Sequence, residues 1–197
     1  MPGSLQTSLT WNQAPGILLA AASRTPGIVT IGITGPVGSG KTTLARRLSS
    51  CIISTDNYLP DYDKVSYDDR DLPHAADLAG LARDLHSLKK GTAADIPLWS
   101  FQSHRREGSR RVDPAPIIVC EGIHALDSNI TPHLDIRIFV DAPATTRWSR
   151  WEVLEQTGQR GWGVDIAREF FDRVAEPTFN RYAAAYRAAA HYVVINP

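Results

Sequence analysis

Short continuous apolar runs alternate with longer amphipathic stretches along most of this chain. The apolar runs cover residues 28–33, 52–55, 117–120, 136–140 and 192–195. Short runs without polar alternation are typical of strands that a parallel sheet buries on both faces. The pattern therefore predicts a mainly parallel sheet of five strands.

The stretches between these runs have helical periodicity and predict helices over residues 42–50, 75–89, 144–157 and 164–190. Pro177 should break or kink the last of these helices, because proline has no N–H to donate. Strands that alternate with helices indicate a doubly wound α/β fold with helices on both faces of the sheet. Ligands of such folds bind at the carboxyl ends of the strands.

The organisation along the chain indicates one domain over residues 27–197 that follows an N-terminal extension over residues 1–26. The first 13 residues are polar and predict a loose segment, and a short helix is expected over 17–23. Two insertions interrupt the scaffold at about 56–74 and 96–112. The second predicts a hairpin with its turn at Gly108-Ser109, and a helical lid is expected over about 144–163.

Composition narrows the classes of partner. The 197 residues include 21 Lys and Arg against 21 Asp and Glu, so no net positive charge favours a nucleic acid or a membrane. The two cysteines lie in apolar runs, which predicts buried thiols and a reducing cytoplasmic compartment. We expect a small-molecule substrate and neither a nucleic-acid nor a membrane partner. Assembly into a homo-oligomer stays an open alternative.

The segment between the first strand and the first helix fits the phosphate-binding pattern G-x-x-x-x-G-K-[ST]. Its glycines allow positive φ, so that backbone N–H groups can surround an anion at a helix N-terminus. Lys41 can reach the β- and γ-phosphates, and the Thr42 hydroxyl suits Mg²⁺. We therefore expect the donor nucleotide to be bound by Gly35, Pro36, Val37, Gly38, Ser39, Gly40, Lys41, Thr42 and Thr43.

Two acidic residues follow strands that should end beside this loop. Asp56 follows the second strand, where it can accept a proton from a substrate hydroxyl or help to hold Mg²⁺. Glu121 follows the third strand and supplies the second acidic position near the metal. The alternatives without a role in chemistry are a helix-capping or loop aspartate for Asp56 and a surface glutamate for Glu121.

Arginines of the expected lid form the third group of candidates. Arg147 and Arg150 lie three residues apart on one helical face, and Arg160 follows a break at Gly158. Arginines that close over a triphosphate offset the charge that develops on the transferred phosphoryl group. Arginine pairs on helices are also common on solvated surfaces.

The motifs occur in the order found in the uridine kinase and phosphoribulokinase group of P-loop kinases. After the phosphate loop come Asp56-Asn57-Tyr58-Leu59, Asp71-Leu72-Pro73-His74-Ala75-Ala76-Asp77, the hairpin segment 96–106, Glu121-Gly122-Ile123, the lid segment 141–151 and Glu176-Pro177-Thr178-Phe179. The chain resembles this family from about residue 28 to 195, and within it the uridine–cytidine kinases.

This resemblance implies an ATP- and Mg²⁺-dependent kinase that phosphorylates the 5′-hydroxyl of a nucleoside such as uridine or cytidine. It implies that Asp56 is the general base and that Lys41, Arg147 and Arg150 act on the phosphates. Mg²⁺ would be held through Thr42, Glu121 and Asp56. The nucleoside would be bound by Tyr58, Asp71, Trp99, His104 and Arg106, with Asp71 on the ribose hydroxyls, Trp99 against the base and His104 at its edge.

Several departures from the family pattern leave the acceptor open. Leu59 and Trp99 replace tyrosines of the family pocket, Ser100 replaces an aspartate, and the lid keeps few arginines. Another alcohol such as pantothenate, or a nucleotide-binding module without transferase activity, therefore stays an alternative. A GTPase switch is disfavoured because the chain lacks an N-K-x-D motif, and the choice between ATP and GTP is undecided.

Overall fold

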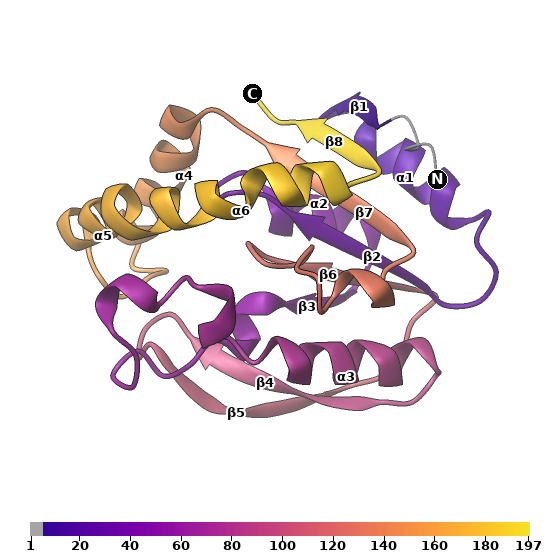
Figure 1. The fold of residues 1–197 in the computed structure, drawn as a ribbon, viewed down its shortest axis with the longest axis horizontal. Coiled ribbons are helices and arrows are strands. Elements are labelled where there is room, and N and C mark those ends of the chain that lie inside the picture. The colour runs from indigo at the N-terminus through magenta and orange to yellow at the C-terminus, as the bar shows by residue number, and fades with distance from the viewer. Residues whose placement is uncertain (1–5) are drawn as a thin grey trace.

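A six-stranded sheet forms the centre of the protein in the computed structural model, which describes residues 6–197 (Figure 1). The strand order is β1-β8-β7-β2-β6-β3, and every neighbouring pair is parallel. The strands are β1 Thr7–Thr10, β2 Val29–Thr34, β3 Cys51–Ser54, β6 Ile117–Glu121, β7 Ile136–Asp141 and β8 Tyr192–Ile195. The five expected strands are present, and the sheet has one strand more than expected.

Helices cover both faces of this sheet, which confirms the doubly layered α/β fold (Figure 1). One face packs against α1 Ala14–Ala22 and α2 Lys41–Leu48. The other packs against α3 Leu78–Lys89 and α6 Glu176–Ala189. Successive side chains of a strand point to opposite faces, so each strand contributes to both layers of core. In β6, Val119 belongs to the first layer and Ile118 and Cys120 to the second.

The additional strand corrects the expectation for the N-terminal extension. Residues 7–10 pair with β8 along its outer edge, where a loose polar segment was expected. Leu9 is buried, although the neighbouring residues of β1 are exposed. Helix α1 starts three residues earlier than the expected helix and buries Leu18 completely in the core. The extension therefore shares the sheet and the core of the domain that follows it.

The second insertion forms an antiparallel hairpin, but its turn lies elsewhere than expected. The strands are β4 Ala94–Ser100 and β5 Arg105–Val112, and residues 101–104 connect them. Gly108 pairs with Leu98 in the middle of the hairpin, so the prediction of a turn at Gly108-Ser109 is wrong. The chain instead reverses at residues 101–104, where His104 takes a φ of 53°. A bulge interrupts the strand pairing between Leu98 and Trp99, before this reversal.

The lid forms a separate packing unit with the helix and the turn that follow it. Helix α4 Ala144–Gln156 packs on α5 Val164–Phe170 and on a π-helical turn, Phe171–Ala175, through residues such as Trp151, Phe170 and Val174. The expected break near Pro177 is confirmed. Proline cannot donate a helical hydrogen bond and its ring crowds the preceding turn, so the helix widens before α6 begins.

The first insertion runs through short 3-10 turns at Thr55–Tyr58, Tyr67–Asp69 and Pro73–Ala75, and a fourth such turn lies at Thr131–His133. Helix α3 begins at Leu78 and not at residue 75, because Asp77 caps it by accepting a hydrogen bond from the Gly80 N–H at 2.8 Å. Within residues 6–197, no helix has both the length and the apolar character that a bilayer crossing requires.

Candidate functional site

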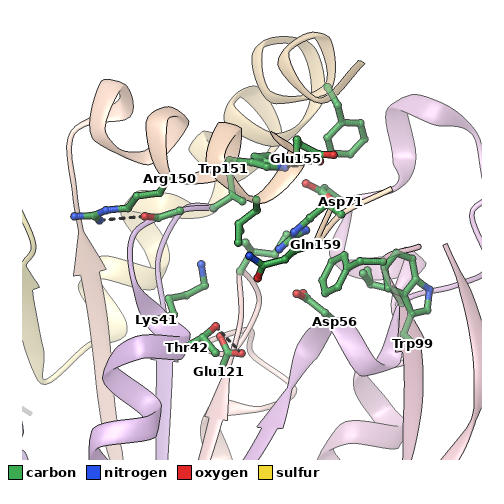
Figure 2. A pocket seen from close by; sticks show the side chains of 18 of the residues that line it. Lys41, Thr42, Asp56, Asp71, Trp99, Glu121, Arg150, Trp151, Glu155 and Gln159 are labelled. Atoms are coloured by element: carbon green, nitrogen blue, oxygen red, sulfur yellow. Dashed lines mark hydrogen bonds between the residues drawn. The ribbon is translucent and has the colours of Figure 1, made fainter. Parts of the chain in front are cut away.

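A cavity of about 450 Å³ lies at the carboxyl ends of β2, β3 and β6, beneath the lid and beside the hairpin. Figure 2 shows Lys41, Thr42 and Glu121 at one end of it and Asp56 and Trp99 at the other. Its lining also includes Val37, Gly38, Gly40, Thr43, Arg46, Leu59, Tyr62, Asp71, Phe101, His104, Ile123, Arg150, Trp151, Leu154, Glu155, Gln159, Arg160, Trp162 and Phe170. We call this cavity the central pocket.

The phosphate loop connects β2 to α2 at the base of the pocket. Gly35, Gly38 and Gly40 have φ values of 150°, 74° and 100°, a region that L side chains rarely adopt. The loop is also tightly packed, since a Cβ atom on Gly38 would lie 2.5 Å from the backbone oxygen of Arg147. Sequence and packing together therefore require glycine here.

The loop offers polar groups that suit an anion. The Lys41 ammonium is buried and donates a hydrogen bond to the Pro36 carbonyl at 2.9 Å. Burial lowers the pKa of Lys41, and the nearby Glu121 and Asp56 oppose this effect. The buried Ser39 hydroxyl has no hydrogen-bond partner among the described residues. These features fit a phosphate group bound in the loop.

Glu121 lies at the end of β6 and faces the first turn of α2. Its carboxylate accepts a hydrogen bond from the Thr42 hydroxyl at 3.2 Å. Burial raises the pKa of Glu121, as does Asp56, whereas Lys41 lowers it. Within residues 6–197, no cluster of three His, Cys, Asp or Glu side chains could hold a metal alone. Thr42, Glu121 and Asp56 nevertheless fit Mg²⁺, which takes few protein ligands when phosphates supply the others.

Asp56 and Asp71 bring two further carboxyl groups into the same pocket. Asp56 lies in the 3-10 turn after β3, whose first turn is capped by Ser54. Asp71 comes from the loop between two 3-10 turns of the first insertion. Burial, together with the neighbouring charge of Asp56, raises the pKa of Asp71 to about 7.

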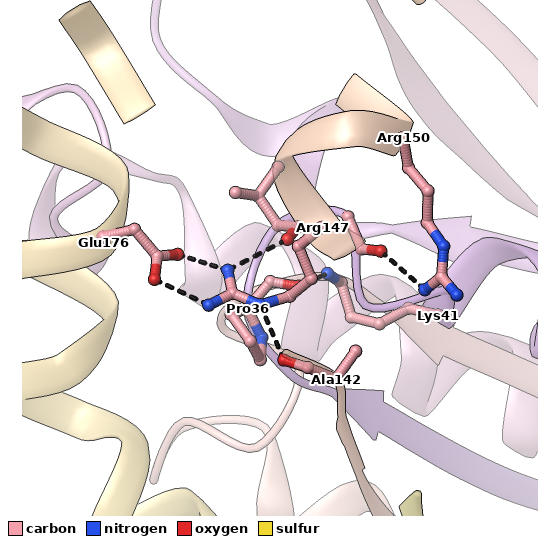
Figure 3. Close-up of polar contacts among 8 residues, drawn as sticks. Pro36, Lys41, Ala142, Arg147, Arg150 and Glu176 are labelled. Carbon is pink, nitrogen blue, oxygen red and sulfur yellow. Dashed lines mark hydrogen bonds and ion pairs between the residues drawn. The ribbon is translucent and has the colours of Figure 1, made fainter. Parts of the chain in front are cut away.

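Arg147 differs from the sequence expectation. Its side chain is 5% exposed and points away from the central pocket, toward the start of α6 (Figure 3). The guanidinium forms a two-pronged ion pair with Glu176 and donates to the carbonyls of Ala142 at 2.9 Å and Val37 at 3.3 Å. Arg147, which belongs to α4, therefore connects the phosphate loop to α4 and to the start of α6.

Arg150 lines the pocket but is held at its rim. It donates to the carbonyls of Gly38 at 3.2 Å and Pro197 at 3.0 Å. Asn196, which sequence reasoning missed, follows β8 and donates from its amide to the Ser39 carbonyl at 2.8 Å. Its position just past a strand end is the signal that could have pointed to it, because such residues gather at the ligand edge of the sheet.

Arg160 lies at the end of the central pocket that is formed by the hairpin. It follows α4 in the lid, lines the central pocket and lies over the ring of Phe101 at 3.8 Å. The sequence included Arg160 among the lid arginines, after a break at Gly158, but gave the phosphate-binding role to Arg147 and Arg150.

The end of the pocket opposite the phosphate loop has an aromatic wall, and part of this wall comes from the lid. The rings of Tyr62, His104 and Trp162 stack on one another, with 5.5 Å between Tyr62 and His104 and 4.8 Å between His104 and Trp162. Trp99 lines the pocket too, but its indole N–H already donates to the Pro60 carbonyl at 3.1 Å. No sequence motif indicated Tyr62 or Trp162.

Tyr58 and Arg106 lie outside the pocket, contrary to expectation. Tyr58 is 1% exposed and donates from its hydroxyl to Asp84 at 2.6 Å, beneath α3. Arg106 is exposed on the hairpin, where its backbone N–H donates to Asp61. Tyr58 and Leu59 are adjacent in the sequence, but only Leu59 lines the pocket, whereas the Tyr58 side chain lies in the core.

Comparison with known proteins identifies relatives of this chain. The family model of the phosphoribulokinase / uridine kinase family matches residues 55–196. A uridine kinase of Clostridium perfringens (strain SM101) is 33% identical over 178 residues, which are 83% of this chain and 85% of that protein. A uridine kinase of Staphylococcus aureus (strain JH9) is 31% identical over 78% of this chain and 84% of that protein.

The fold is also similar to solved structures. A structure described as a possible uridine kinase from Bacillus stearothermophilus superposes with a TM-score of 0.68. The match covers 93% of this chain and 98% of that one, at 17% sequence identity. At this identity the likeness concerns the fold.

Proposed function

We propose that this chain, which belongs to the phosphoribulokinase / uridine kinase family, transfers the γ-phosphoryl group of ATP to a nucleoside. The acceptor group is the 5′-hydroxyl of uridine or cytidine. One observation carries the proposal. The phosphate loop with Lys41 and Thr42 shares a single pocket with Asp56 and Asp71. A switch or motor needs the first group of residues, whereas an alcohol kinase needs both.

The proposed roles follow from this arrangement. The acceptor oxygen attacks the γ-phosphorus, its proton passes to the Asp56 carboxylate, and the bond to the ADP oxygen breaks. Lys41 and the backbone N–H groups of the loop offset the charge on the phosphate oxygens. Arg160, from the lid, takes the place that the sequence gave to Arg147.

Thr42, Glu121 and Asp56 are the residues proposed to hold Mg²⁺ between the two halves of the pocket. The ion would supply positive charge that offsets the charge of the phosphate oxygens. The Thr42 hydroxyl donates a hydrogen bond to Glu121, so the oxygen atoms of the two side chains lie next to each other.

The acceptor half suits a ribose with a planar base. Asp71 offers carboxylate oxygens to a pair of hydroxyl groups. Tyr62, Trp99, Phe101 and His104 supply ring surface on which a base could stack. His104 has a ring nitrogen for the base edge, and burial lowers its pKa, which favours the neutral ring.

ADP release, coupled to a spectroscopic assay, tests this function with a panel of acceptors. The panel contains uridine, cytidine, adenosine, guanosine and pantothenate, each with ATP and with GTP. We expect turnover with uridine or cytidine above all others. Turnover with pantothenate alone would overturn the nucleoside assignment, and no turnover with intact ATP binding would favour a module without transferase activity.

Substitution of the proposed base separates a kinase from a binding module. Asp56→Asn should lower kcat by about a hundredfold or more, because general-base catalysis contributes on that order, while ATP binding persists. Asp63→Asn serves as the matched control, since Asp63 is exposed on the same insertion and pairs with Arg105. Equal turnover in both variants would remove Asp56 from this role.

A second candidate function, phosphorylation of a smaller alcohol without a base, is favoured by the occupied indole N–H of Trp99. That group is bonded to Pro60 and offers no donor to a base edge. The pantothenate arm of the acceptor panel decides between the two candidates.

A further inference from the structure

A buried histidine lies directly behind the central pocket and has no part in the roles described so far. His124 is 2% exposed and comes three residues after Glu121. Its Nε2 atom lies 2.8 Å from the backbone oxygen of Asp71, and its Nδ1 atom lies 3.0 Å from the Tyr186 hydroxyl. It therefore connects the Asp71 loop to α6 through the core.

The direction of these hydrogen bonds follows from their partners. A carbonyl oxygen can only accept, so Nε2 carries a proton and donates it to Asp71. In the neutral ring, Nδ1 then accepts from the Tyr186 hydroxyl. Burial lowers the pKa of His124 and raises that of Tyr186, which keeps both groups neutral.

Asp71 depends on such contacts for its position. It lies between the 3-10 turns at Tyr67–Asp69 and Pro73–Ala75, outside any strand or longer helix. Its carboxyl group also shares the pocket with Asp56, whose charge disfavours ionisation at this place. A fixed main chain is therefore needed to hold the Asp71 side chain against repulsion from Asp56.

The segment that carries His124 touches both halves of the pocket. Glu121, at its start, accepts the hydrogen bond from Thr42 on the donor side. Gly122 has a φ of 143° and packs so closely that an added Cβ would lie 1.9 Å from the hydroxyl oxygen of Thr55, next to Asp56. The Ile123 carbonyl accepts from the Thr34 hydroxyl at 2.8 Å. Four consecutive residues thus fix the distance between the phosphate loop and Asp71.

We propose that His124 is a positioning residue that holds the Asp71 carboxylate at the acceptor site and so sets the affinity for acceptor hydroxyl groups. This inference rests on the proposed function for its kinetic consequence, but its structural consequence is independent of that function. His124 acts through the Asp71 main chain and touches neither the acceptor nor the nucleotide.

A pair of amide substitutions tests this role. In His124→Gln the amide nitrogen can lie near the former Nε2 position and donate to Asp71, whereas in His124→Asn it is too short to do so. We expect the KM for the acceptor to rise about tenfold in His124→Asn, as the loss of one buried hydrogen bond would cause. His124→Gln should stay within about twofold of the natural protein, and the KM for ATP should change little in both.

Hydrogen exchange measured by mass spectrometry supplies a readout that does not need turnover. Amides of residues 67–76 should exchange about tenfold faster in His124→Asn and at the natural rate in His124→Gln, whereas those of residues 35–42 should not change. Equal exchange of residues 67–76 in both variants would overturn the inference, as would equal increases in the KM values for acceptor and ATP. If the natural protein phosphorylates no acceptor, the proposed function fails, and exchange alone decides the role of His124.

Discussion

The buried Arg147 and the partly buried Glu176 form a two-pronged ion pair that joins the lid helix α4 to the first turn of α6 (Figure 3). The same guanidinium holds the carbonyl of Val37 in the phosphate loop. The arginine that the sequence assigned to the phosphates of ATP thus supports the loop from behind. We therefore expect loss of this ion pair to lower the free energy of unfolding more than it lowers catalysis.

Loss of the acidic partner should destabilise the fold. Glu176→Gln leaves the buried Arg147 charge without a counterion, and we expect a loss of about 3–5 kcal/mol in the free energy of unfolding, measured by urea denaturation. Glu169→Gln is the matched control, because its pair with Arg173 is exposed on both sides and should cost less than about 1 kcal/mol. Natural stability of Glu176→Gln would mean that Arg147 is free to serve the pocket.

Arg160 should carry the catalytic charge of the lid. Arg160→Gln removes a cation that lines the central pocket, and we expect kcat to fall by about a hundredfold with little change in the midpoint of unfolding. Arg173→Gln, on the exposed side of the π-helical turn, should leave kcat unchanged. Steady-state kinetics with both variants makes the comparison. If the two behave alike, Arg160 does not contact the phosphates.

Asp71 should make stability depend on pH. Its pKa is about 7 in the folded protein against 3.8 for an ordinary aspartate, so the folded state keeps the proton longer than the unfolded chain. The stability it contributes is therefore lost as pH rises from about 4 to about 7. As the pH rises across this window, the free energy of unfolding of Asp71→Asn should increase by about 2 kcal/mol relative to that of the natural protein. This figure includes a reduction for solvent screening at the partly exposed Asp71.

Urea denaturation at a series of pH values measures this difference. Glu121 has a pKa shifted in the same direction, but it is present in both proteins and cancels in the comparison. Asp95→Asn, exposed on the hairpin, provides the control and should follow the natural protein at every pH. A constant difference between Asp71→Asn and the natural protein would show that Asp71 ionises normally.

The phosphate loop should tolerate no side chain at Gly38. Gly38→Ala brings a Cβ atom to 2.5 Å from the Arg147 backbone oxygen, so binding of an ATP analogue should be abolished in calorimetry. Gly27→Ala is matched in backbone strain, with a φ of 77° against 74°, but meets no atom within 4 Å. It should cost about 1–2 kcal/mol in stability and keep nucleotide binding. Binding by Gly38→Ala would refute the packing argument.

Two adjacent leucines test whether the N-terminal extension belongs to the core. Leu18 is fully buried in α1, so Leu18→Ala should lower the free energy of unfolding by about 3 kcal/mol. Leu19 is 38% exposed, and Leu19→Ala should cost less than about 1 kcal/mol. Denaturation followed by circular dichroism measures both. Equal effects would mean that α1 packs only weakly on the sheet.

Local patterns in the sequence were sufficient for the scaffold and for the phosphate loop. Apolar runs marked every strand of the six-stranded sheet except β1, which buries only Leu9 and has no continuous apolar run. Glycine spacing located the loop, because positive φ at Gly38 and Gly40 is a property of the backbone itself. The place of Asp56 and Glu121 in the pocket lining was predictable, since strand ends meet at one edge of the sheet.

Side-chain direction, by contrast, was decided only by tertiary packing. Arg147 and Arg150 have similar places in the sequence pattern, but Glu176, from a helix 29 residues away, draws Arg147 out of the pocket. Tyr58 and Leu59 are neighbours of which only Leu59 reaches the pocket. The sequence by itself thus determined where the glycine-rich loop lies, because the loop depends on backbone conformation. The tertiary structure decided which side chains face it, because that depends on partners distant in the chain.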